Sequence, residues 1–354
     1  MAVSGKNNGA GLIGAARKTA SSLGHVFGQR VEPMDFKGRT VIITGGSRGF
    51  GLAMARAFAG EGARLVLLAR DKDELERASR DVREHAGQGG DVLAIRCDVT
   101  DEGEIGQAIA RAARHFGHVD VLVNNAGEIQ VGPVEDMAVA DFQEAMAEHV
   151  YAPLHAMRAA IPYMRKQGGG RIVNIASVGG RVAIPHLVPY CTSKFALVGL
   201  SDGMRAELAK DNIRVTTVSP GLMRTGSHLN ALFKGQQRAE FTLFTLAGAS
   251  PLASINADRA AQQTVEACRN GTPELTISIQ ARLLSVANVL FPNVVARVMA
   301  VTASALPGAR SGTGIQPKTG WQSRTGLSPS LLTTLLDQAT AQYNGLRGRR
   351  SARQ

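Results

Sequence analysis

The amino-acid sequence predicts an α/β fold: a Rossmann-like, doubly wound parallel sheet of about seven strands, flanked by helices and followed by a helical C-terminal extension. Short β-branched runs alternate with helix-like segments from residue 39 to about residue 280. The connections between them are short, which favours right-handed crossovers between parallel strands. Glycine-rich and polar motifs directly follow several predicted strands, and ligands bind at this edge in sheets of this class.

The strands are predicted from runs of residues that can be buried on both faces of a sheet. The first, residues 39–44, is a β-branched run bounded by Gly38 and Gly45. The other strands are predicted at residues 64–68, 92–97, 119–123, 171–176, 213–218 and 274–279. Helices are predicted at residues 52–59, 72–84, 102–115, 142–165 and 193–210.

A glycine-rich turn, residues 45–51, separates the first predicted strand from the first predicted helix. Gly45, Gly49 and Gly51 allow a tight turn and a close approach to a pyrophosphate, and the helix N-terminus offers N–H groups to the anion. This spacing differs from the common G-x-G-x-x-G fingerprint. A glycine-rich turn can also be purely structural, but a strand before it and a helix after it favour nucleotide binding.

Tyr190 and Lys194 stand four residues apart, thirteen residues after Ser177. Positions four apart share one face of a helix, so a phenol and an ammonium group would lie side by side. The positive charge favours phenolate and is expected to lower the pKa of Tyr190 from about 10. Such a pair alone could simply lie on a solvated helix face. The glycine-rich turn, which predicts a bound nucleotide cofactor in the same chain, favours a role of the pair in proton transfer.

Further motifs follow other predicted strands. Asp98 follows the third strand, Asn124–Gly127 follows the fourth, and Pro220–Gly221 follows the sixth. Together with the glycine-rich turn, Ser177 and the pair Tyr190–Lys194, these motifs make the chain similar to the short-chain dehydrogenase/reductase family. The resemblance covers residues 38–225, and the set of motifs is highly specific.

The resemblance implies roles for individual residues. Tyr190 would be the general acid/base, Lys194 would lower its pKa and bind the nicotinamide ribose, and Ser177 would orient the substrate oxygen. Asp98 would meet the adenine, and Thr225 would contact the carboxamide end of the cofactor. The residues expected to bind the cofactor are Thr44, Gly45, Ser47, Arg48, Gly49, Phe50, Gly51, Arg70, Asp98, Val99, Asn124, Ala126, Gly127, Tyr190, Lys194, Pro220, Gly221 and Thr225. No metal is expected.

The chain departs from the family pattern at His149, which aligns with an asparagine that normally holds a water in the proton relay behind the lysine. Histidine can donate and accept hydrogen bonds and titrates near neutral pH. His149 is therefore a candidate catalytic residue that keeps the relay or alters its pH response. The alternative is a half-buried histidine with a packing role.

The end of the second predicted strand bears on the choice of cofactor. An acidic residue there would accept the adenine ribose hydroxyls and repel a 2′-phosphate, but the sequence has Ala69 at that position, followed by Arg70. Arg48 and Arg70 suit bidentate contact with a phosphate. The sequence therefore favours NADP(H) over NAD(H), with Asp71 expected to face solvent.

The 354-residue chain has a formal net charge of +11 that is concentrated near its ends. Residues 1–37 carry five Lys/Arg against two acidic residues, and residues 306–354 carry seven against one. The charge therefore does not indicate a nucleic-acid-binding fold. Three widely spaced cysteines, without a zinc-binding spacing, indicate reduced thiols and a cytoplasmic location.

We expect four regions along the chain. Residues 1–37 would be a basic N-terminal extension, flexible or weakly helical, and residues 38–280 the catalytic domain. Residues 281–306 would be an apolar helical segment. Residues 307–354 would be a basic, partly disordered tail, with a mobile linker at 308–330 and a short helix at 331–343.

Residues 281–306 are apolar for most of their length, but Asn288, Pro292, Asn293 and Arg297 interrupt them. We therefore expect two short helices that meet at Pro292 rather than a membrane-spanning helix. These helices could pack on the substrate cleft, on a partner subunit or on a membrane surface, so peripheral membrane association is an alternative.

Residues 222–250 are expected to form a lid over the substrate site. This region is rich in Leu and Phe and poor in acidic residues, which suits a hydrophobic or lipid-like ketone or alcohol. The alternative is that these apolar residues only pack against the rest of the protein, which would need the same composition. Arg181, His186 and Met223 are expected to line the same pocket.

The sequence thus predicts an NADP(H)-dependent oxidoreductase that interconverts a ketone or aldehyde and an alcohol, with Tyr190 as general acid/base. Two alternatives are a cofactor-binding regulatory protein whose relay is lost at His149, and a membrane-associated scaffold. A small carbonyl or alcohol compound is the expected partner, nucleic acid is not, and the helices at 142–165 and 193–210 are expected to support a homo-oligomer.

Overall fold

The computed structural model of the chain describes residues 31–86, 90–251, 253–309, 316–326, 330 and 333–345. The chain divides after Pro33, and Met34–Gln354 forms the larger unit, to which all that follows refers. The expectations for residues 1–30 of the N-terminal extension, for residues 310–315 and 327–329 of the linker and for residues 346–354 of the tail lie outside the described residues.

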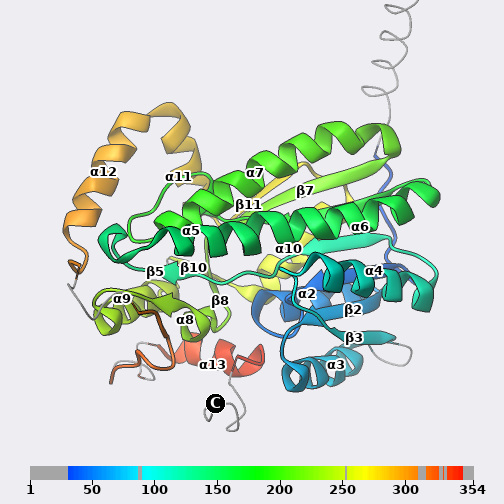
Figure 1. Ribbon diagram of the computed structural model, residues 1–354, viewed down its shortest axis with the longest axis horizontal. Coiled ribbons are helices and arrows are strands. Elements are labelled where there is room, and N and C mark those ends of the chain that lie inside the picture. Colours follow the sequence, from blue (N-terminus) through cyan, green and yellow to red (C-terminus); the bar gives the residue numbers. More distant parts are fainter. Residues whose placement is uncertain are drawn as a thin grey trace, which may run out of the picture. The chain divides into compact units, whose positions relative to one another are not determined.

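A seven-stranded sheet with the order β11-β7-β6-β4-β1-β2-β3 forms the centre of the fold (Figure 1). All neighbouring strands in it are parallel; in β1, for example, Val41 pairs with Leu65 of β2 and with Val121 of β4. The predicted doubly wound parallel sheet is therefore confirmed. Its strands are β1 (Thr40–Thr44), β2 (Arg64–Ala69), β3 (Val92–Arg96), β4 (Val121–Asn124), β6 (Gly170–Ile175), β7 (Ile213–Pro220) and β11 (Glu274–Ile277).

Helices cover both faces of this sheet, because alternate residues of each strand point to opposite faces. Val41 and Ile43 of β1 belong to one hydrophobic core, and Ile42 belongs to the other. The first core is closed by α2 (Gly49–Gly60), α3 (Lys72–Ala86) and α10 (Ala257–Arg269), and the second by α4 (Glu102–Phe116) and α6 (Ala152–Lys166).

Two predicted helices differ from the structure in ways that affect the site. The segment predicted as one helix at 142–165 consists of α5 (Val139–Met146), a π-helical turn at Ala147–Tyr151 and α6. Such a turn inserts an extra residue into the helix, and it carries His149. Helix α7 (Val188–Leu208) begins five residues before the predicted start, because Pro189 suits the first turn of a helix.

The region predicted as a lid contains β8 (Leu222–Arg224), α8 (Ser227–Asn230), β9 (Leu232–Phe233) and α9 (Gln237–Ala249). Strand β8 pairs with β10 (Ser254–Asn256). Strand β9 lies between β5 (Gln130–Val131) and β12 (Lys318–Thr319) in a separate small sheet.

The predicted helical C-terminal extension is present. Helix α11 (Ile279–Leu290) packs against β11 and is followed at Pro292 by α12 (Pro292–Ser304), and α13 (Thr334–Gln342) lies beside β8 and α9 (Figure 1). Across the described ranges, no helix is both long and apolar enough to cross a membrane. The side chains of α11 and α12 remain largely exposed, with Ala281 and Val295 as the buried exceptions.

Candidate active site

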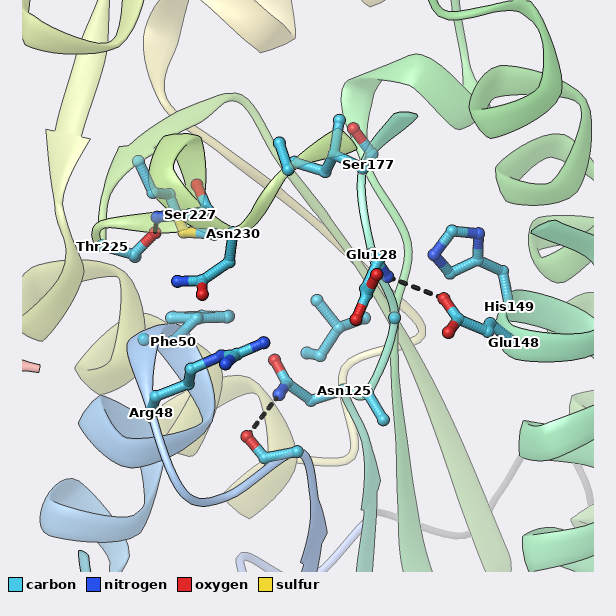
Figure 2. Close-up of a pocket in the computed structure, with 18 of the residues that line it drawn as sticks. Arg48, Phe50, Asn125, Glu128, Glu148, His149, Ser177, Thr225, Ser227 and Asn230 are labelled. Atoms are coloured by element: carbon cyan, nitrogen blue, oxygen red, sulfur yellow. Dashed lines mark hydrogen bonds between the residues drawn. The ribbon is translucent and has the colours of Figure 1, made fainter. Parts of the chain in front are cut away.

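A pocket of about 620 Å³ lies where β1, β2, β3, β4, β6 and β7 end, and the lid region contributes to its wall (Figure 2). The carboxyl ends of parallel strands meet at one edge, so motifs far apart in the sequence come together there. Most of the residues predicted to bind cofactor or substrate line this pocket, namely Gly45, Ser47, Arg48, Gly49, Phe50, Arg70, Asp98, Val99, Ala126, Gly127, His149, Ser177, Tyr190, Lys194, Pro220, Gly221, Met223 and Thr225.

Three other residues predicted to bind the cofactor are absent from the pocket lining but support the residues that form it. The Thr44 hydroxyl oxygen accepts hydrogen bonds from the backbone N–H groups of Asn125 (2.9 Å) and Ala126 (3.1 Å). Asn124 donates from Nδ2 to Asn174 Oδ1 over 2.8 Å inside the sheet. A Cβ added to Gly51 would lie 2.1 Å from a backbone oxygen of the same loop, so only glycine fits there.

Two residues expected in the substrate pocket are absent from its lining. Arg181 pairs with Glu274 over 2.9 Å, and His186 Nδ1 lies 2.8 Å from Glu240 Oε1. Both side chains thus connect neighbouring elements, Arg181 through an ion pair and His186 through a hydrogen bond. That expectation was wrong because sequence position alone does not show to which side a loop residue turns.

Ser177, Tyr190 and Lys194 meet at the floor of the pocket. Ser177 follows β6, and the other two side chains project from successive turns at the start of α7. Lys194 Nζ donates to the Ile175 carbonyl oxygen over 2.9 Å and lies 5.7 Å from the centre of the Tyr190 ring. The spacing read from the sequence therefore brings these groups together as predicted.

The pKa values of Tyr190 and Lys194 differ from those expected from the sequence. Burial raises the pKa of Tyr190 to about 12, and a hydrogen bond with Ser177 offsets part of this rise. Burial also lowers the pKa of Lys194 to about 7, although the Glu148 carboxylate opposes that change. Lys194 is thus only about half protonated at neutral pH. It binds a carbonyl oxygen instead of the phenol, so the expected acidification of Tyr190 is not seen in this arrangement.

His149 is buried in the π-helical turn, against Gly127. Its Nδ1 lies 2.8 Å from Ser193 Oγ, and Ser193 Oγ donates its own proton to the Tyr190 carbonyl oxygen. The hydroxyl can then only accept from the imidazole, which assigns the proton to Nδ1 and leaves Nε2 as an acceptor. Burial, together with Lys194, holds the pKa of His149 well below its usual value, so the ring is neutral at working pH.

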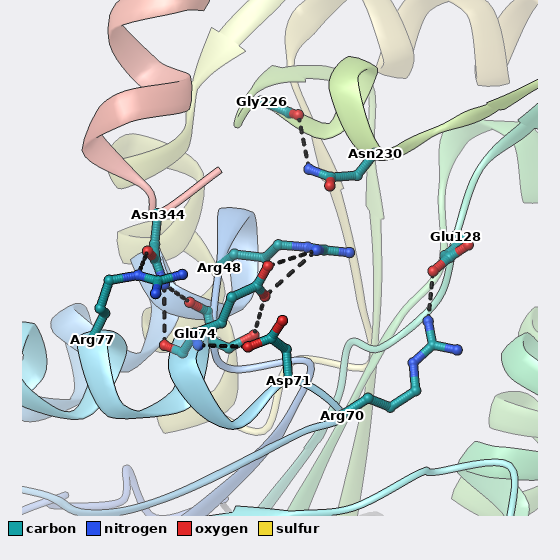
Figure 3. A network of polar contacts seen from close by, with 10 residues as sticks. Arg48, Arg70, Asp71, Glu74, Arg77, Glu128, Gly226, Asn230 and Asn344 are labelled. Atoms are coloured by element: carbon teal, nitrogen blue, oxygen red, sulfur yellow. Dashed lines mark hydrogen bonds and ion pairs between the residues drawn. The ribbon is translucent and has the colours of Figure 1, made fainter. Parts of the chain in front are cut away.

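Two carboxylates that the sequence analysis did not single out, Glu74 and Glu128, line the pocket beside Arg48 and Arg70 (Figure 3). Glu74 lies 3.1 Å from Arg48 and accepts from Ser47 Oγ over 3.2 Å, and Glu128 pairs with Arg70. Asp71 was expected to face solvent; it is exposed but also lines the pocket. Glu74 and Asp71 follow β2 directly, so their place at the sheet edge was the available signal.

The pocket fits the phosphate groups of a dinucleotide on structural grounds. The residue before α2, Arg48, makes no side-chain cap. Of the first N–H groups of α2 in the described part of the chain, that of Gly49 donates to the Tyr343 carbonyl oxygen, and those of Phe50 and Gly51 have no side-chain partner. In the loop at residues 45–51, Gly45 and Gly49 have left-handed backbone conformations, and a Cβ on Gly51 would collide with the Gly45 carbonyl oxygen, so a larger residue would disturb the loop at each of these positions. Such a helix N-terminus is a general anion site, and the nearby arginines add positive charge.

This fold and site define a class of enzymes: doubly wound α/β proteins that bind a dinucleotide beside a serine, a tyrosine and a lysine. The profile of the short chain dehydrogenases matches residues 39–233, and the chain belongs to this family of oxidoreductases. It is 39% identical over 217 residues to the dehydrogenase/reductase SDR family protein 7-like of Anopheles gambiae, which covers 60% of this chain and 68% of that protein.

Solved structures of the same family agree with the fold. L-sorbose reductase of Gluconobacter frateurii, complexed with NADPH and L-sorbose, superposes with a TM-score of 0.62 at 29% identity, covering 69% of this chain and 97% of that one. NAD⁺-bound xylitol dehydrogenase gives a TM-score of 0.61 at 28% identity, covering 69% and 99%. One of these two structural neighbours thus holds NADPH and the other NAD⁺.

Proposed function

We propose that this chain uses NADP(H) to interconvert a ketone or aldehyde and an alcohol, with Tyr190 as the general acid/base. The observation that carries the proposal is that Ser177, Tyr190 and Lys194 share one pocket with the glycine-rich loop and the start of α2, where Arg48 makes no side-chain cap. A bound nicotinamide would supply the hydride donor or acceptor. The residues fit such a group, and the proton chemistry belongs to the chain itself.

In the reductive direction, Tyr190 donates its hydroxyl proton to the substrate oxygen. With its pKa raised to about 12, the phenol is fully protonated at neutral pH and so holds the proton to be transferred. Ser177 stabilises the developing alkoxide by a hydrogen bond, and loss of such a donor costs roughly 2–4 kcal/mol in barrier height. In the oxidative direction Tyr190 must lose its proton, and protonated Lys194 would stabilise the phenolate.

The test combines a binding measurement with a turnover measurement. Oxidation of NADPH is followed with a panel of ketones and aldehydes that includes steroid and fatty-acyl carbonyls. Tyr190→Phe should keep NADPH affinity while lowering kcat by about 10²- to 10⁴-fold. Wild-type protein that binds NADPH but turns over no carbonyl would favour the cofactor-binding regulatory protein, and undiminished turnover in the variant would refute the proposal.

The preference for NADP(H) is proposed from Ala69, Arg48 and Arg70. Arg48 and Arg70 already contact carboxylates, so a 2′-phosphate would have to compete with Glu74 and Glu128 for them. Arg48→Ala combined with Arg70→Ala should raise the KM for NADPH far more than that for NADH. Glu74→Gln should act in the opposite direction, because it removes the competing charge beside Arg48. Equal effects on both cofactors in each variant would contradict the preference.

We propose a hydrophobic substrate because much of the pocket wall outside the glycine-rich loop is apolar. The lid and neighbouring loops contribute Leu222, Met223, Phe244, Ile184 and Leu187. Removing apolar area from water contributes about 25 cal/mol per Å², so longer apolar carbonyls should have lower KM values. Equal KM values for short and long alkyl ketones would refute this.

For α11 and α12 we propose contact with a membrane surface. Exposed apolar side chains run along both helices, including Leu283, Val289, Val294 and Val301, and residues 279–306 contain two arginines and no acidic residue. A helix that is apolar on most sides suits an apolar medium better than one flat partner. Co-sedimentation with anionic vesicles should be lost in Val289→Glu, and an unchanged bound fraction would point away from the membrane.

We also propose a cytoplasmic homo-oligomer. Cys97, Cys191 and Cys268 are free and buried, in keeping with reduced thiols. Tyr151 and Phe195 are exposed on the helices expected at the subunit contact. Light scattering should give a mass above that of one chain, and Phe195→Glu should lower it. A membrane-bound scaffold without turnover is the remaining alternative, and the carbonyl panel tests it.

A further inference from the structure

A C-terminal segment packs against the glycine-rich loop, nearly 300 positions earlier in the sequence. This segment, residues 333–345, contains α13 and is called the strap below. The Tyr343 carbonyl oxygen accepts a hydrogen bond from the Gly49 backbone N–H over 2.9 Å. Its ring is fully buried in the same core as α2, and the Arg56 guanidinium lies 5.4 Å from the ring centre. The strap is therefore joined to the loop through both backbone and side chain.

Asn344 makes the polar part of this contact (Figure 3). Its Nδ2 donates to the backbone oxygens of Ser47 (2.8 Å) and Glu74 (3.1 Å), and its Oδ1 accepts from Arg77 Nε over 2.9 Å. Ser47 belongs to the glycine-rich loop, and Glu74 and Arg77 belong to α3. A single amide thus ties together the two elements that flank the expected cofactor phosphates. Only an amide has the donors and the acceptor for all three bonds.

The opposite side of the strap faces the lid region. Leu336 lines the pocket, and α13 packs against α9 and β8. A Cβ added to Gly226, just before α8, would lie 2.9 Å from Thr340, so the two backbones are in close contact. The strap therefore bridges the cofactor loop and the lid, which the central sheet does not connect directly.

We propose that the strap holds the glycine-rich loop in its cofactor-binding geometry, with Asn344 as the main positioning residue. The inference rests on the proposed dinucleotide-binding function of the pocket. Ordering a loop on binding costs conformational entropy, and a contact that orders it beforehand lowers this cost. Neither Tyr343 nor Asn344 is among the residues that line the pocket. Their bonds to the Gly49 N–H and the Ser47 carbonyl oxygen therefore restrict the loop backbone without occupying the pocket.

The experiment uses the full chain and variants at residue 344. Asn344→Gly suits the left-handed backbone (φ 55°) while removing the three side-chain bonds, and Asn344→Asp keeps the shape but replaces both donors. Asn270→Ala is the matched control, because Asn270 follows the end of α10, donates to Glu266 in the last turn of that helix and is remote from the loop. NADPH and NADH dissociation constants are measured by calorimetry without substrate.

Both residue-344 variants should raise the dissociation constants of NADPH and NADH by about tenfold, since each loses hydrogen bonds that preorganise the loop. At saturating cofactor, kcat should stay within about twofold of wild type, because the chemical groups are untouched. The control should match wild type in both respects. Unchanged dissociation constants in folded Asn344→Gly would overturn the proposal, as would a lower melting temperature without any loss of affinity.

Hydrogen exchange separates failure of the strap from failure of the proposed function. In cofactor-free protein, the amides of residues 45–51 should exchange about tenfold faster in Asn344→Gly than in wild type. If wild type binds neither dinucleotide, the proposed function fails, while exchange at the loop still decides whether the strap orders it. Unaltered exchange at residues 45–51 would overturn the strap on its own.

Discussion

Replacing Lys194 by methionine should stabilise the folded protein at pH 7, although Lys194 is a proposed catalytic residue. Lys194 is 5% exposed, and its Nζ donates to the Ile175 carbonyl oxygen over 2.9 Å. Burial lowers the pKa of Lys194 from 10.5 to about 7. Lys194 is protonated in the unfolded chain at neutral pH, and burying its ammonium group on folding costs free energy.

The sign and size of the effect follow from these two pKa values. Between pH 7 and pH 10.5 the unfolded state binds more protons than the folded state, so stability rises with pH in this window. The cost of Lys194 to folding is ~4 kcal/mol at pH 7 and falls to ~1 kcal/mol at pH 10. Methionine carries no such cost at either pH.

The substitution also has a cost that does not depend on pH. Methionine cannot donate to the Ile175 carbonyl oxygen, and leaving such a buried group without its donor costs about 1–3 kcal/mol. We therefore expect Lys194→Met to gain ~2 kcal/mol in free energy of unfolding at pH 7 and to lose stability at pH 10. The difference between the two pH values, ~3 kcal/mol, isolates the contribution of the charge.

The assay is urea unfolding of cofactor-free protein at pH 7 and pH 10, for wild type and variant. Lys210→Met is the matched control, because Lys210 is exposed just beyond the same helix. Its effect should be small and equal at both pH values. If the change in free energy caused by Lys194→Met is the same at pH 7 and pH 10, the reasoning about the buried ammonium is wrong.

Three further outcomes are expected. Gly51→Ala should lower NADPH affinity at least about tenfold, because the added Cβ would meet a backbone oxygen of the loop. Gly60→Ala in the same helix is the control: its Cβ would have open space, so NADPH affinity should not change. Similar affinities of the two variants in a binding titration would contradict this. His149→Asn should leave the pH profile of kcat/KM unchanged between pH 6 and pH 9, because the pKa of His149 lies well below its usual value. A shifted profile would instead show that His149 titrates as part of the proton relay. Burial raises the pKa of the Cys97 and Cys268 thiols to about 12, so native protein at pH 8 should resist iodoacetamide and react only after unfolding, as mass spectrometry would show.

Local sequence patterns were enough to predict the sheet and to bring together the three proposed catalytic residues. A strand buried on both faces needs a continuous run of residues such as Val41–Ile43, and this signal is local. Strand–helix alternation then dictates parallel pairing, which brings residues that follow the strands, such as Ser177, to one edge. The four-residue spacing of Tyr190 and Lys194 reports their helical proximity in the same local way.

Tertiary structure alone decided the protonation states and the long-range contacts. The pKa values of Tyr190 and Lys194 depend on burial by surrounding elements, and burial outweighed the attraction between neighbours that the sequence suggested. Pairing of Arg48 with Glu74, and of Asn344 with the glycine-rich loop, joins residues whose separation in the chain carries no periodic signal. Backbone preferences act over a few residues, whereas desolvation and packing depend on which distant surfaces the fold brings together.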